Sequence, residues 1–135
     1  MSSQKINDEA TRWFSTAEED IAVAKLLRDN KKYSHACFTS QQAAEKAVKA
    51  LYFSNDLDPW GHSIKKLIST LDALKFEKLK LMEPDAAKLD RFYIPTRYPN
   101  GLPGLTPSEA YSEVDAQEAI TIAENIIEFA RGMIK

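Results

Sequence analysis

The sequence predicts an all-α protein, most simply an antiparallel up-down bundle of four main helices, with a short helix in the fourth position and a proline-rich loop. Apolar residues recur at steps of three and four in several long segments, which is the spacing of amphipathic helices. We find no strand-type alternation longer than three residues and no internal repeat. A chain of 135 residues is long enough for one core, so we expect residues 1–135 to form a single domain.

The segment from Tyr33 to Phe53 contains neither Pro nor Gly, so we expect it to form one long helix, which we take as the central one. One strip of this helix carries only small side chains: Ala36, Ser40, Ala43, Ala47 and Ala50. Small side chains allow a neighbouring helix to approach closely, so we expect this helix to be contacted on more than one side.

The opposite face of the same segment is polar and carries Gln42, Glu45, Lys46 and Lys49. Glu45 and Lys49 have the spacing and the order of a favourable i,i+4 ion pair. Spacing alone favours the interpretation that this face is a solvated surface.

The segment before it is expected to form the first helix, capped by Asn7 or Asp8. Its apolar stripe runs from Ala10 to Leu27, and Asp20 interrupts the inner edge of that stripe. Because an unpaired buried charge is costly, we predict that Asp20 bonds to a neighbouring helix. The short polar connection at residues 29–32 predicts that the first two helices are antiparallel.

After a loop at residues 54–61, a third helix is expected to begin at His62 or Ser63, with apolar residues at helical spacing as far as Leu74. Residues 76–82 are apolar without a regular spacing. Pro84 is suited to the first turn of a short helix, which must end by Ile94 because Pro95 follows.

The next segment is a loop rich in proline, and ordered loops of this length are often functional. The pair Thr106 and Glu109 has the spacing of a capping box around one helical turn. Ser112 and Asp115 are a weaker signal of the same kind for the last helix, which has a regular apolar pattern as far as Ile134.

The loop after the short helix gathers the best candidates for a binding site. It offers two aromatic rings, three hydroxyl groups, a guanidinium and an amide within a few residues: Tyr93, Thr96, Arg97, Tyr98 and Asn100. Arg97 is suited to a two-point contact with a phosphate or a carboxylate. An alternative is that Arg97 pairs with an internal acid such as Asp20 or Glu45 and pins the loop to the bundle, and both interpretations stay open on the residues alone.

Composition excludes several classes of function. The formal charge of −2 gives no basic footprint of a general nucleic-acid binder. No apolar run is long enough to span a membrane and no signal peptide is visible, so we expect a cytoplasmic protein. The single cysteine, Cys37, fits a packing role, and His35 and His62 are too far apart for a metal-ligand pattern. We predict no metal site and no catalytic residue.

Several segments of the sequence resemble those of one known protein family. The segment Ala36-Cys37-Phe38, followed by Gln41-Gln42-Ala43-Ala44-Glu45-Lys46-Ala47-Val48-Lys49-Ala50-Leu51, resembles the signature of the HEPN (higher-eukaryote and prokaryote nucleotide-binding) domain family. Four further segments fit the same family: Ala17-x-x-Asp20-Ile21-x-x-Ala24, Gly61-His62, Thr96-Arg97-Tyr98-Pro99 and Asp115-Ala116-x-x-Ala119-Ile120. The resemblance covers roughly residues 8–131.

The resemblance implies a homodimer with a polar cleft for a nucleotide such as ATP or GTP and with no required cofactor. It also implies a minimal nucleotidyltransferase as partner, in a two-component system that in some cases is a toxin–antitoxin module. The candidate nucleotide-binding residues are Tyr93, Thr96, Arg97, Tyr98, Asn100, Lys46 and Lys49. The secondary candidates are Asp20, Gln42, Glu45 and His62.

The ribonuclease branch of the family has an Arg followed after four to six residues by His near the start of a late helix. No histidine follows Arg91, Arg97 or Arg131, and the pair Arg28 and His35 straddles the turn between the first two helices. The first interpretation is therefore a non-catalytic subunit that binds a nucleotide or a nucleotidyltransferase. The alternatives are a metal-independent ribonuclease toxin and a purely structural interaction module.

Overall fold

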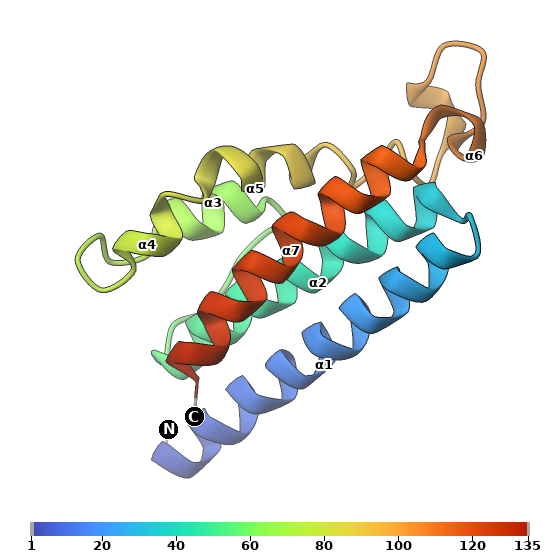
Figure 1. The fold of residues 1–135 in the computed structure, drawn as a ribbon. Helices are drawn as coiled ribbons and strands as arrows, with labels where there is room; N and C mark the ends of the chain where they lie inside the picture. The colour runs from blue at the N-terminus through green and yellow to red at the C-terminus, as the bar shows by residue number, and fades with distance from the viewer. Residues whose placement is uncertain (1, 135) are drawn as a thin grey trace.

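The computed structural model describes residues 2–134, and within them all regular structure is helical. Three long helices form the body of the molecule: α1 (Ser3–Asp29), α2 (Tyr33–Ser54) and α7 (Glu113–Met133). Helices α1 and α2 are antiparallel and joined by a short turn, and α7 runs alongside both (Figure 1). The all-α helical bundle expected from the sequence is confirmed.

The three long helices pack through alanines that recur every seventh residue. The buried alanines are Ala10, Ala17 and Ala24 on α1, Ala36, Ala43 and Ala50 on α2, and Ala116, Ala123 and Ala130 on α7. Small side chains at this spacing allow the helix axes to approach closely. Helix α2 is consequently contacted by α1 and α7 and also by shorter helices, as expected of the central helix.

Between α2 and α7, the chain forms three short helices in place of a further long one: α3 (Ile64–Ser69), α4 (Glu77–Lys80) and α5 (Glu83–Asp90) (Figure 1). The expectation that the third helix continues to Leu74 is wrong. Helix α3 ends at Ser69 because the carboxylate of Asp72 accepts the backbone N–H groups of Leu74 and Lys75, which closes a turn. Leu74 is then 91% exposed, although Leu71 still reaches the core.

The expected cap of the first helix is also wrong. Helix α1 begins four residues earlier than Asn7, because the hydroxyl of Ser2 accepts the backbone N–H of Lys5. Asp8 lies inside the helix and accepts a bond from the side chain of Gln4. Within residues 2–134, no helix combines the length and the apolar character that are needed to cross a membrane.

The proline-rich loop extends past the end of the bundle (Figure 1) and contains a 3₁₀ turn, η1 (Pro99–Gly101), and a helical turn, α6 (Pro107–Ala110). Both predicted capping boxes are confirmed: Thr106 and Glu109 cap α6, and Ser112 and Asp115 cap α7. The loop is therefore anchored at its C-terminal end by local hydrogen bonds.

A carboxylate at the end of α5 fixes the loop that carries His62. Asp90 accepts the backbone N–H of Ile64 at 2.7 Å and the hydroxyl of Ser63 at 2.8 Å, and so caps α3 from another helix. Ser63 in turn accepts the backbone N–H of Lys66. This arrangement holds the residue before Ser63 against α2.

We predict that Asp90→Ala lowers the free energy of unfolding by about 2 kcal/mol, because it removes a cap and leaves donors unsatisfied. Urea unfolding measures this. Asp85→Ala, at an exposed acid on the same helix that faces Lys88 at 3.8 Å, is the control and should cost less than about 1 kcal/mol. Equal losses in the two variants would contradict the assigned role of Asp90.

Candidate functional site

A line of aromatic and polar side chains runs along one face of α2. Its members are Phe38, Gln41, Gln42, Glu45, Lys46, Lys49 and Phe53. The expectation of a solvated surface is wrong for Glu45 and Lys49, which are only 4% and 8% exposed, and the neighbouring Gln41 is fully buried. Side chains from α1 lie against one edge of this line, and the loop segments that carry His62 and Arg97 lie against the other. We call this line of seven residues the α2 strip.

The carboxylate of Glu45 is the hydrogen-bond acceptor at the centre of the α2 strip. Lys49 Nζ lies 3.0 Å from Glu45 Oε2, so the predicted i,i+4 ion pair is confirmed. His62 Nδ1 lies 3.1 Å from the same oxygen, and Gln41 Nε2 donates to Oε1 at 3.1 Å. Gln41 Nε2 also lies 3.3 Å from the carbonyl oxygen of His62. A buried carboxylate is stable only with such partners, and these partners join α2 to the loop before α3.

Arg97 lies among aromatic rings. Its guanidinium carbon is 4.3 Å from the ring centroid of Phe38, 4.8 Å from that of Tyr93 and 5.3 Å from that of Tyr98. Its Nε donates to the carbonyl oxygen of Tyr93 at 2.8 Å. Guanidinium groups stack favourably on aromatic faces, so these contacts hold the loop on α2.

Neither acid that was considered as a partner of Arg97 takes that role. Asp20 bonds to Lys46 at 2.6 Å, which confirms the predicted bond from Asp20 to a neighbouring helix. Glu45 is paired with Lys49. Within residues 2–134, Arg97 forms no ion pair, and its two terminal nitrogens have no hydrogen-bond acceptor. The loop is pinned by aromatic contacts, and most of the guanidinium's donors remain available.

Side chains that are distant in the sequence form one continuous series of contacts. The ring of His62 stacks on that of Tyr93, with centroids 4.8 Å apart and planes 18° apart. Tyr93 contacts Arg97, and His62 contacts Glu45. At the other end, Lys49 Nζ lies 6.0 Å from the ring centroid of Trp13 on α1.

In the structure, most of the candidate residues form two groups, and two further residues connect these groups. Tyr93, Arg97, Tyr98 and His62 gather at the start of α2, whereas Lys46 and Asp20 lie toward α1, and Glu45 and Lys49 connect the two groups. Gln42 lies between them and donates to Gln41. Thr96 is buried, and its hydroxyl donates to the carbonyl of Phe92, so it supports the loop from inside. Asn100 is exposed in η1.

Sequence reasoning missed Phe38 and Trp13. Phe38 lies four residues before Gln42 on the same helix face, so its spacing was a usable signal. Spacing places Trp13 in the apolar stripe of the first helix, between Ala10 and Leu27. Its side chain instead packs on Phe53, with ring centroids 5.2 Å apart, and its indole N–H donates to Glu9 at 3.0 Å.

The other candidates for chemistry are occupied or buried. Cys37 is fully buried, and this burial raises the pKa of its thiol to about 12, so it is a packing residue. Arg28 bonds to Asp29 and Gln117. Within residues 2–134, no group of three potential metal ligands is found.

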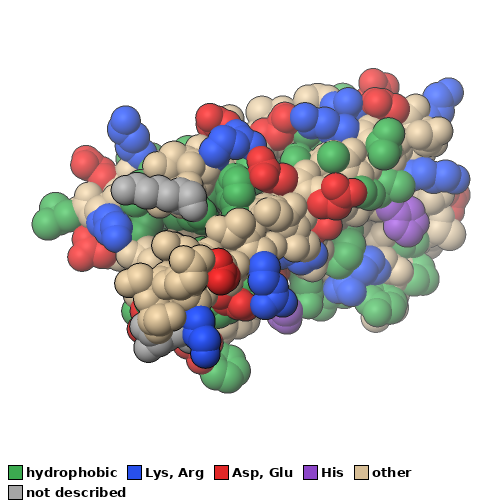
Figure 2. Space-filling model, turned by 90° about the horizontal axis from the view of Figure 1, so that it is seen from below, with side chains coloured by type: hydrophobic (Ala, Val, Ile, Leu, Met, Phe, Trp, Pro, Cys, Tyr) green, Lys and Arg blue, Asp and Glu red, His purple; other side chains and the backbone are tan. Residues whose placement is uncertain are grey.

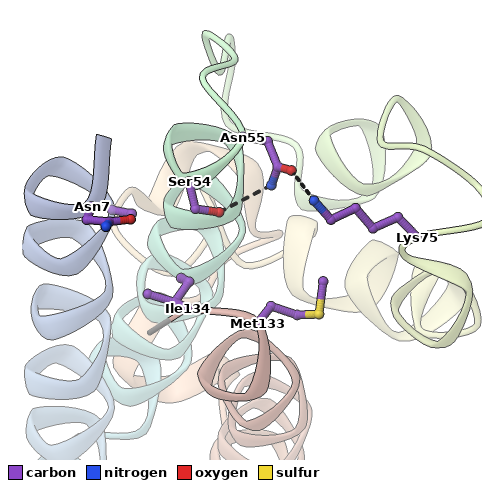
Figure 3. Close-up of a pocket in the computed structure, with 7 residues that line it drawn as sticks. Asn7, Ser54, Asn55, Lys75, Met133 and Ile134 are labelled. Carbon is purple, nitrogen blue, oxygen red and sulfur yellow. Dashed lines mark hydrogen bonds between the residues drawn. The ribbon is translucent and has the colours of Figure 1, made fainter. Parts of the chain in front are cut away.

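A hollow of about 150 Å³ lies at the end of the bundle, lined by residues near the start of α1 and the ends of α2 and α7 (Figure 3). Lys75 donates to Asn55 there, and Asn55 donates to Ser54 at 3.2 Å and to the carbonyl of Leu51 at 2.7 Å. These groups satisfy one another and the C-terminal end of α2. We therefore assign this hollow to helix capping.

Comparison with known proteins identifies the family. The family model of the HEPN domain matches residues 10–133, and this chain belongs to that family. It is 32% identical to the Methanocaldococcus jannaschii protein named "Putative toxin MJ1304", over 93% of this chain and 88% of that protein.

Three solved structures have a similar fold and a related sequence. The crystal structure of TT1696 from Thermus thermophilus has a TM-score of 0.84 at 33% identity and covers 91% of this chain and 96% of that chain. An archaeal HEPN homologue has a TM-score of 0.77 at 36% identity, with 93% and 98% covered. A HEPN domain protein from Thermotoga maritima has a TM-score of 0.71 at 32% identity, with 90% and 96% covered.

We predict that Glu45→Ala lowers the free energy of unfolding by about 3 kcal/mol, because it leaves Lys49 buried without its counter-ion. The double variant Glu45→Ala, Lys49→Ala should lose less than the sum of the two single variants, with a coupling of at least about 1 kcal/mol. Urea unfolding of the four proteins measures it.

The exposed pair Lys25 and Glu124, 2.6 Å apart, is the control for this cycle. Its coupling should stay below about 0.5 kcal/mol, because solvent screens both charges. Strict additivity at Glu45 and Lys49 would show that the buried pair does not organise the site.

Proposed function

We propose that this HEPN domain binds a nucleotide and is non-catalytic by itself. In this proposal the terminal nitrogens of Arg97 hold a phosphate. The observation that carries the proposal is a guanidinium fixed on three aromatic rings with its outer donors unpaired within residues 2–134. A donor group fixed before binding loses little entropy on binding. Bidentate contact with phosphate is the interaction to which guanidinium is best suited.

The other candidate residues have separate roles in this proposal. Tyr98 is 52% exposed and offers a ring on which a base can stack. Tyr93 is covered by His62 and Arg97, so it positions the site. His62 uses Nδ1 for Glu45 and keeps its other ring nitrogen for the ligand. Asn100, exposed in η1, adds hydrogen bonds.

Surface charge supports a local site for a small ligand. Acidic and basic side chains interleave over the face shown in Figure 2, so they create no extended field of one sign. A long nucleic acid gains affinity from many cations in a row, whereas one nucleotide needs only a few positioned donors. This agrees with the formal charge of −2.

We further propose that the domain acts as a homodimer with a minimal nucleotidyltransferase, in a cytoplasmic two-component or toxin–antitoxin-like system. The family membership and the similarity to a protein named as a toxin support this. Copurification of the tagged chain from its native host, followed by mass spectrometry and light scattering, tests the partner and the dimer. A monomer without a nucleotidyltransferase would contradict this part of the proposal.

We predict that Arg97→Leu weakens ATP or GTP binding by about tenfold or more, because a charge-assisted hydrogen bond is worth about 1.5–3 kcal/mol. Leucine keeps apolar contact with the rings but loses the bond to the Tyr93 carbonyl, so the thermal midpoint should fall by a few degrees while the protein stays folded. Titration calorimetry measures affinity. Arg91→Leu, at an exposed arginine, is the control and should bind as the wild type does. Unchanged binding in Arg97→Leu would overturn the assignment.

A ribonuclease is the second candidate, because one observation favours it. Arg97 and His62 both pack on Tyr93, so an arginine and a histidine lie at one site although these two residues do not have the family's spacing. For this candidate, purified protein should cleave RNA without added metal, and Arg97→Leu with His62→Ala should abolish cleavage. Cleavage that survives this double variant would exclude both residues as catalytic groups, and absence of cleavage by the wild type would favour the nucleotide-binding proposal.

A further inference from the structure

A surface hollow of about 280 Å³ lies beside the far end of the α2 strip. It is lined by Glu9, Arg12, Trp13 and Thr16 of α1 and by Lys46 of α2. It therefore combines an indole ring, two cations and a hydroxyl group. The proposed nucleotide site at Arg97 uses none of the four α1 residues.

The indole in this hollow is held in place before any ligand arrives. Its N–H donates to Glu9, and Glu9 also holds Arg12 at 3.0 Å. Phe53 lies against the ring, with centroids 5.2 Å apart. Fixed aromatic rings beside cations are favourable surfaces for the stacking of nucleobases.

The hollow is joined to the Arg97 site by the series of contacts already described. Lys49 lies between Trp13 and Glu45, and Glu45 holds His62 beside Tyr93. Lys49 follows Phe38 by eleven residues on α2, which corresponds to about 17 Å of helix. One base cannot stack at both ends of such a distance, so two aromatic platforms on one strip suit a ligand with two bases.

Two positioned lysines lie next to the Trp13 platform. Lys46 is held by Asp20 at 2.6 Å and Lys49 by Glu45 at 3.0 Å. An ammonium group has three N–H donors, so each lysine keeps donors for a second acceptor. The acids fix the position of the lysines without using their full capacity. Phosphate oxygens are acceptors of the kind that such lysines bind.

We infer that the Trp13 hollow is a second base-binding subsite, and that the α2 strip takes a dinucleoside polyphosphate, with two bases joined by bridging phosphates. One base lies at Tyr98 with its phosphate on Arg97, the second lies at Trp13, and Lys46 and Lys49 contact the phosphates between them. This inference rests on the proposed nucleotide site at Arg97.

Tryptophan fluorescence tests it directly, because the chain has two tryptophans and the other, Trp60, is 82% exposed on a loop. Trp60→Phe leaves Trp13 as the reporter. We expect diadenosine tetraphosphate to quench this fluorescence saturably and to bind at least tenfold more tightly than ATP. In the matched Trp13→Phe protein, which keeps Trp60, the ligand should leave the emission nearly unchanged.

Two variants separate the subsites. Thr16→Glu places a carboxylate at an exposed position in the hollow, where it repels phosphate without changing the core. It should reduce affinity for diadenosine tetraphosphate to that for ATP and leave ATP affinity unchanged. Arg97→Leu should weaken both ligands. A cooperative thermal transition in each variant shows that the variant is folded.

The possible failures are distinguishable. If ATP binds through Arg97 but diadenosine tetraphosphate binds no more tightly, or Thr16→Glu has no effect, the second subsite is overturned and the proposed function stands. If neither ligand binds the wild-type protein, both proposals are overturned together.

Discussion

The buried carboxylate of Glu45 is the constraint on which the arrangement of this site depends. A charge in the middle of the central helix is tolerated only because Lys49, Gln41 and His62 surround it. These partners come from α2 itself and from the loop before α3, so satisfying one charge fixes the position of that loop. Asp90 completes the effect by capping α3 from α5. The loop is thereby held from two sides.

The position of Arg97 follows from that of His62. His62 stacks on Tyr93, and Tyr93 provides both the carbonyl and one of the rings that hold Arg97. The binding and pinning interpretations of Arg97 are therefore compatible. Aromatic faces pin the guanidinium without consuming its outer donors, whereas an internal carboxylate would have used them. This difference makes the arginine a credible ligand-binding group.

Local signals in the sequence predicted the helices well. The capping boxes at Thr106 and Ser112 and the packing role of Cys37 follow from short-range chemistry, and the structure confirms them. The end of α3 was missed because apolar spacing continued through Leu74 while the Asp72 turn stopped the helix. The start of α1 was missed because Ser2 and Asn7 are both acceptable caps, and the choice between them depends on the residues that extend the helix.

The candidate site was predictable only in part. The residues of the loop and of α2 could be named, but spacing cannot show which neighbour covers a helix face. Hence only the folded chain shows that Glu45 and Lys49 are buried. It also shows that Trp13 lies near Lys49 and that Phe38 lies near Arg97. The sequence predicts that Asp20 bonds to a neighbouring helix, because an acid on an apolar stripe needs a partner. It does not show that this partner is Lys46.

Backbone amide chemical shifts during titration with ATP or GTP, with and without Mg²⁺, test the central claim most directly. We predict saturable shifts that begin at Arg97–Gly101 and extend through His62 to Glu45 and Lys49, because these residues form one series of contacts. Absence of shifts at millimolar nucleotide, or shifts confined to a distant surface such as the one around Lys88 and Gln117, would contradict it. The α2 strip would then be an internal structural network, and a protein partner would be the ligand to seek.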